Sequence, residues 1–150
     1  HVLRQISEVL GCRPKGRGSD LAQALRTANQ TLKRRSIVVV LSDFRSADYR
    51  SELVLLARKH DVIAVRLTDP LDTSFPPGGL VEIKDAESGE SFTIWGKQQK
   101  VRDSYAEFWD DHRRLWLETC RSAGVDVLEV GTDEEPADSL QAFFRRRRGK

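Results

Sequence analysis

The run IVVVL at residues 37–41 constrains the fold of this chain more than any other stretch. Its aliphatic residues are consecutive and do not alternate with polar ones, which is typical of a strand covered on both faces of a parallel sheet. We therefore predict a central, buried strand. Two further short apolar runs, DVIAVRL at residues 61–67 and VDVLEV at residues 125–130, predict two more strands of the same sheet.

Helical periodicity separates these runs. Apolar side chains recur at helical spacing over residues 49–60, 101–116 and 140–144, and two more such stripes, 2–10 and 21–32, precede the first strand. Strands that alternate with helices predict an α/β fold with a doubly wound, mostly parallel sheet and flanking helices. The segments LVEIKD and SFTIWG, joined by the turn AESGE, add a β-hairpin over residues 80–96.

Length and composition predict one soluble domain over residues 1–150. Hydrophobic residues make up 39% of the chain and charged residues 32%, which is ordinary for a globular protein. No apolar run approaches the length needed to cross a bilayer, so we expect this segment to be cytoplasmic and to make no membrane contact. Cys12 and Cys120 lack metal-site spacing and are expected to be reduced thiols. The net charge of +2 depends largely on RRRR at 145–148, so we expect no nucleic-acid partner.

Two polar residues are candidate ligands of a metal ion. Asp43 directly follows the first strand, and Ser19 precedes a helix that packs on the same sheet. Ligands of open parallel sheets bind beyond the carboxyl ends of the strands, and Mg²⁺ prefers oxygen donors such as hydroxyl and carboxylate. The alternative is that both residues only cap helices, with Ser19 or Asp20 at one helix start and Asp43 at the next.

Four segments together resemble a known family. GRGSDLAQAL at 16–25, RSIVVVLSDF at 35–44, ARKHDVIAVRLTDP at 57–70 and LQAFFRRRR at 140–148 are similar, in this order, to the second part of the bacterial family of domain of unknown function 58. The fold of that family resembles the von Willebrand factor A domain. The resemblance thus implies an α/β sheet with a metal-ion-dependent adhesion site built from three loops.

This resemblance gives the two candidate ligands a role. Ser19 matches the threonine position of the second loop, and Asp43 matches the aspartate of the third. The Asp-x-Ser-x-Ser loop is absent from the chain, and the resemblance implies that it lies upstream of His1 with the first strand. We therefore expect a remnant site that holds no metal in this chain and Mg²⁺ in the complete domain. The missing strand would leave an unpaired sheet edge, so we hypothesise a homodimer.

The resulting prediction is a non-enzymatic protein–protein interaction module. The resemblance implies a partner class, the MoxR-type AAA+ ATPases, for assembly or chaperone-like work, and membrane anchoring of the intact protein by helices upstream. The alternative is an α/β enzyme that binds a phosphorylated small molecule near Lys15–Ser19, where Lys15, Arg17 and the helix start would form an anion site. A catalytic triad of Ser42, Asp43 and His60 is disfavoured because LSDF lacks the Gly-x-Ser-x-Gly elbow.

Overall fold

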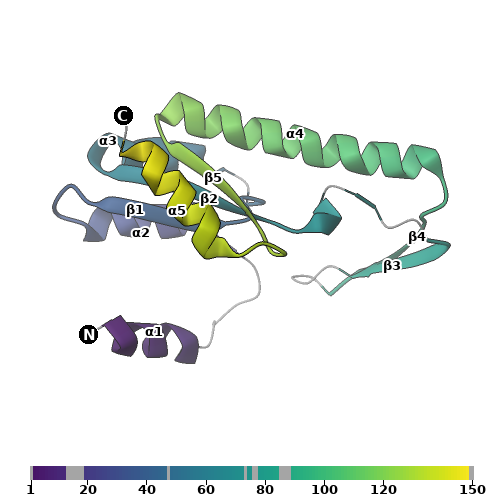
Figure 1. Ribbon diagram of the computed structural model, residues 1–150, viewed down its shortest axis with the longest axis horizontal. Coiled ribbons are helices and arrows are strands. Elements are labelled where there is room, and N and C mark those ends of the chain that lie inside the picture. The colour runs from purple at the N-terminus through teal and green to yellow at the C-terminus, as the bar shows by residue number, and fades with distance from the viewer. Residues whose placement is uncertain are drawn as a thin grey trace.

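A computed structural model describes residues 2–12, 19–46, 48–72, 74–75, 78–84 and 89–148. Its elements are, in chain order, α1 (Val2–Gly11), α2 (Leu21–Thr31), β1 (Ile37–Ser42), α3 (Arg50–Lys59), β2 (Asp61–Thr68), the short 3-10 helix η1 (Pro70–Asp72), β3 (Leu80–Lys84), β4 (Ser91–Trp95), α4 (Gln99–Ala123), β5 (Asp126–Gly131) and α5 (Pro136–Arg147). Figure 1 shows their arrangement. The predicted mixture of helices and strands is confirmed.

Three parallel strands form the main sheet, in the order β1-β2-β5. Ile37 of β1 pairs with Asp61 of β2, and Ile63 of β2 pairs with Asp126 of β5. The prediction that the IVVVL strand is central is wrong for the described residues: β2 is central, and β1 forms an edge. A continuous aliphatic run indicates burial, but it does not say how many neighbouring strands supply it.

One face of this sheet is packed against α2, α3 and α4. The core there joins strand residues to the apolar stripes of the three helices, and its fully buried members include Leu53, Leu56, Trp116 and Cys120. Trp116 and Cys120 lie four residues apart and therefore on the same side of α4, the side that packs on the sheet. Cys12 is exposed, and neither it nor Cys120 forms a disulfide.

The opposite face is covered only in part. Helix α5 crosses in front of the strands in Figure 1 and packs Phe143 against β2 and β5, where Ile63, Val65, Leu128 and Val130 are buried. The same face of β1 has no described cover: Ile37, Val39 and Leu41 are exposed to 63%, 44% and 65%. The edge strand therefore presents three aliphatic side chains beside a backbone edge that no other described strand covers.

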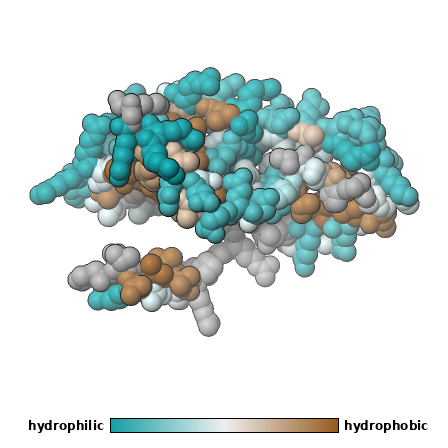
Figure 2. Space-filling model, viewed as in Figure 1, coloured by the Kyte–Doolittle hydropathy of each residue, from teal (hydrophilic) through white to brown (hydrophobic). Residues whose placement is uncertain are grey.

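Two segments stand away from this core. The predicted hairpin is confirmed, with β3 and β4 antiparallel and Leu80 paired with Trp95. Helix α1 lies apart from the sheet in Figure 1 and exposes Leu3, Val9 and Leu10. Figure 2 shows hydrophobic residues gathered on this helix and over the hairpin at the other end of the molecule.

Candidate functional site

The loop after β1 is fixed by a residue in an unusual backbone conformation. Phe44 has a positive φ of 56°, which is a strained value for a bulky residue. Its ring is 1% exposed and packs against Tyr49 and Trp116, with ring centroids 5.6 and 5.7 Å apart. The backbone N–H of Phe44 donates to Ser42 Oγ at 3.0 Å. Burial of this ring holds the turn in place and leaves the preceding residue, Asp43, at the surface.

Asp43 lies at the carboxyl edge of the sheet, as predicted, and its carboxylate already has partners. Oδ1 accepts the backbone N–H of Arg45 at 3.1 Å, and Oδ2 lies 3.4 Å from Arg45 Nε. The guanidinium of Arg45 also binds Asp72 Oδ1 at 2.6 Å and stacks 4.4 Å from the ring centre of Trp109. Arg45 thus bridges two carboxylates against an aromatic face.

The segment that holds Ser19 lies beside this loop. Ser46 Oγ donates to the backbone oxygen of Ser19 at 3.3 Å, which joins the start of α2 to the loop after β1. The helix cap is Asp20, whose Oδ1 accepts the N–H of Gln23 at 2.8 Å. A capping role for Asp43 at the next helix is wrong, because α3 follows Tyr49 and has no side-chain cap.

The donors present fall short of a Mg²⁺ site. Ser19 offers one hydroxyl and Asp43 one carboxylate that Arg45 engages, whereas Mg²⁺ demands octahedral oxygen coordination. Over the residues with described positions, no group of three or more acidic, histidine or cysteine side chains could hold a metal ion. A Mg²⁺ ion bound here would need ligands from outside this described set.

A charge network around one buried arginine lies beside the loop, and the sequence analysis did not predict it. Arg66 of β2 is 3% exposed, and its Nη1 donates to Glu129 Oε2 at 3.2 Å. Arg113 of α4 binds both carboxylate oxygens of Glu129 at 2.6 to 2.9 Å. These residues line a cavity of about 180 Å³ with Trp109 and Asp110. A signal was available: Arg66 is the only basic residue inside the apolar run DVIAVRL.

His112 on α4 does not add a further positive charge to this region at neutral pH. Burial, followed by the charges of Arg66 and Arg45, lowers the pKa of its imidazole. The ring therefore stays neutral at pH 7, and the arginines remain the cations of the site.

The other sequence candidates do not come together here. His60 precedes β2 at the amino edge of the sheet, whereas Ser42 ends β1 at the carboxyl edge, which separates them by about 18 Å of strand. A Ser42–Asp43–His60 triad is therefore excluded by the topology. Lys15 and Arg17, the candidates for an anion site, lie outside the described residues. Of the aromatic residues on α4, Trp116 is buried in the core, whereas Phe108 is 61% exposed.

Comparison with known proteins identifies the family. The profile of the family described as "Protein of unknown function DUF58" matches residues 1–115. The chain belongs to this family. The DUF58 match covers α1 to most of α4, and with them the Ser19 segment and the loop of Asp43.

Two similar relatives are mycobacterial proteins. The chain is 34% identical to the uncharacterized protein MAV169 of Mycobacterium avium, over 91% of this chain and 81% of that protein. It is 31% identical to the uncharacterized protein Rv1480 of Mycobacterium tuberculosis, over 99% of this chain and 47% of that protein. The chain thus spans about half the length of the latter relative. No solved structure matches it significantly. None of the helices described is long and apolar enough to cross a membrane.

Proposed function

We propose that this DUF58 chain is part of a von Willebrand A-like module that binds a protein partner at the carboxyl edge of its parallel sheet and catalyses no reaction. The observation that carries the proposal is the contact between Ser46 Oγ and the Ser19 backbone, because it joins two of the loops from which such an adhesion site is built. The three parallel strands with helices on both faces are compatible with this fold.

In the complete domain, Ser19 and Asp43 would be two ligands of a Mg²⁺ site that is completed by residues outside the described set. The ion would supply the positive charge that a partner's carboxylate recognises. In the present chain, Arg45 supplies a positive charge at the same edge, paired with Asp43 and Asp72. A MoxR-type AAA+ ATPase is the partner class that we propose, for assembly or chaperone-like work.

Calorimetric titration with Mg²⁺ tests the proposal. We compare this chain with a longer chain that begins upstream of His1, each as wild type and as Asp43→Ala. The matched control is Asp111→Ala, which removes an exposed carboxylate of α4. Binding is expected only in the longer wild type and in its Asp111→Ala variant. If the longer wild type fails to bind, or if Asp43→Ala binds as tightly, the metal-site proposal is wrong.

The ion pair between Arg45 and Asp43 permits a second, more specific Mg²⁺ titration. Mg²⁺ has to compete with the guanidinium for the Asp43 carboxylate, which lies 3.4 Å from Arg45 Nε. In the longer chain, Arg45→Gln is therefore expected to tighten Mg²⁺ binding. A weaker affinity would mean that Arg45 organises the loop and does not compete with the ion. Binding of a purified AAA+ ATPase in Mg²⁺ and in EDTA then tests the partner class.

A further inference from the structure

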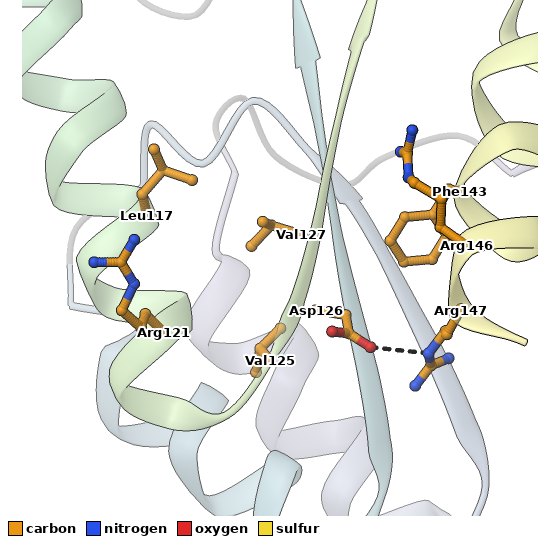
Figure 3. A pocket seen from close by; sticks show the side chains of 8 residues that line it. All are labelled: Leu117, Arg121, Val125, Asp126, Val127, Phe143, Arg146 and Arg147. Atoms are coloured by element: carbon orange, nitrogen blue, oxygen red, sulfur yellow. Dashed lines mark ion pairs between the residues drawn. The ribbon is translucent and has the colours of Figure 1, made fainter. Parts of the chain in front are cut away.

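A groove lies at the amino end of β5, at the opposite edge of the sheet from Asp43. Its volume is about 510 Å³, and Figure 3 shows its lining. The side chains come from α4, from β5 with the residue before it, and from α5: Leu117 and Arg121, then Val125, Asp126 and Val127, then Phe143, Arg146 and Arg147. The groove therefore opens between two helices, along the outer strand of the sheet.

Among the described residues, no strand pairs with the outer side of β5. Strand β5 ends the sheet, and its described partner is β2 alone. The N–H of Thr132 donates to the oxygen of Thr68 at 2.8 Å, which places Thr132 on the β2 side. Peptide groups of alternate residues in a parallel strand face opposite sides, so those of Val127 and Glu129 face outward. An added strand would find hydrogen-bonding groups there.

The floor of the groove is apolar. In Figure 3, Val127 points from β5 toward Leu117 on α4, while Asp126 points toward α5. Val127 is 36% exposed at this edge, and Phe143 closes the groove from α5. An apolar side chain of a bound segment would therefore be buried between α4 and β5.

The rim of the groove carries three arginines, and two of them have no ion-paired partner among the described residues. Arg147 is paired with Asp126, at 2.8 Å, and with Asp61. Arg121 and Arg146 are exposed on opposite walls, and among the residues with described positions neither side chain has a hydrogen-bonded or ion-paired partner. Two guanidinium groups are thus available to carboxylates, whose geometry they match.

We propose that the groove binds an extended, acidic segment of a protein partner, which adds as a strand to the outer edge of β5. Main-chain hydrogen bonds to Val127 supply affinity, as in other cases of strand addition. An apolar side chain of the segment packs on Leu117 and Val127, and its acidic side chains bind Arg121 and Arg146. The free strand edge and apolar floor favour a peptide over a nucleic acid, which would bind the exposed arginines without needing either.

Fluorescence anisotropy with the labelled seven-residue peptide Glu-Glu-Val-Glu-Val-Glu-Glu tests this surface. As a strand, this peptide carries glutamates on both faces and valines on one, as the two walls of the groove require. The paired variant Arg121→Glu/Arg146→Glu is expected to weaken binding by about ten-fold or more, because it reverses both charges of the rim. The matched control is Arg145→Glu/Arg148→Glu, which makes the same charge change on α5 outside the groove. This control is expected to weaken binding by less than about two-fold.

A second arm tests the strand pairing itself. An N-methylated version of the peptide, and the protein variant Val127→Pro, each remove hydrogen bonds at the strand edge and are expected to abolish binding. If Val127→Pro fails to fold, the methylated peptide still decides. Equal binding of the methylated peptide, or no binding of the plain peptide at about 1 mM, overturns the proposal. So does tighter binding of a single-stranded oligonucleotide that both arginine pairs weaken equally, since that identifies a nucleic-acid surface.

Discussion

Replacing Glu129 by methionine is expected to lower the free energy of unfolding by about 3 kcal/mol, because it leaves Arg66 as a buried charge without its counter-ion. Arg66 is 3% exposed, and its Nη1 binds Glu129 Oε2 at 3.2 Å. Its Nε has no hydrogen-bond partner among the described residues, and the ring of Trp116, 5.7 Å from Arg66 Cζ, offers only a weak cation–π contact. Loss of one partner of a buried pair costs about 3–5 kcal/mol, and water that enters the neighbouring cavity offsets part of this cost.

Two further variants separate burial from simple loss of an ion pair. Arg113 also binds Glu129, but its side chain is 52% exposed, so Arg113→Met is expected to cost less than about 1 kcal/mol. The double variant Arg66→Met/Glu129→Met removes both charges together and is expected to lie within about 1 kcal/mol of wild type.

Urea unfolding at pH 7, followed by tryptophan fluorescence, measures these differences in the free energy of unfolding. The dependence of that free energy on urea concentration should be the same for wild type and the variants. In a thermal scan, the Glu129→Met variant should melt about 6–12 °C below wild type. The reasoning is refuted if Glu129→Met costs less than Arg113→Met, or if the double variant loses as much as the two single variants combined. Either result would mean that water, and not Glu129, compensates Arg66.

Four other outcomes follow from the structure. Burial, with a contribution from Cys120, raises the pKa of Tyr49 to about 12. The unfolded chain therefore loses this proton first as the pH rises above 10. Between pH 7 and pH 11, urea titrations should show that the free energy of unfolding of wild type falls by about 1.4 kcal/mol more than that of Tyr49→Phe. The lowered pKa of His112 has the opposite effect, because the unfolded state takes up this proton first as the pH falls through 6.5. The free energy of unfolding should therefore fall less from pH 7 to pH 5 in His112→Gln than in wild type. Phe44→Ala should cost about 3 kcal/mol or more by calorimetry, because a fully buried ring is removed from between Tyr49 and Trp116; a cost below 1 kcal/mol would mean that relief of its backbone strain dominates. Light scattering should find dimers of the chain that Val39→Lys converts to monomers, since this charge would lie on the uncovered face of β1; monomeric wild type would contradict the dimer hypothesis.

The strands and helices could be predicted from the sequence because each carries its own pattern. The aliphatic runs at residues 37–41 and 61–67 and the helical stripe on α4 are local signals, and the structure places β1, β2 and α4 there. The uncovered side of β1 could not be predicted in the same way. Whether Val39 is buried depends on which element crosses that face, and α5 packs on β2 and β5 instead.

Of the candidate site, only the position of Asp43 at the end of a strand could be predicted from the sequence. Asp43 was found because it follows a buried strand. Its pairing with Arg45, and the bridge to Asp72, depend on a 3-10 helix 27 residues further on that tertiary packing brings into place. The left-handed conformation of Phe44 had no signal, since phenylalanine is not a residue that favours positive φ.

The register of the strands sets the distance between the two proposed surfaces. Val127 of β5 is level with Ala64 of β2 and Val40 of β1, three residues short of Asp43. The two places are therefore about 10 Å apart along the strands and about 10 Å apart across them, or about 14 Å in all. An extended peptide of three residues or fewer cannot reach both places, and separate small ligands bound there would share no contact. Their binding free energies should then add without cooperativity. If both proposals hold, a ligand at each surface would be held at a fixed distance from the other, which the pairing of the three strands sets.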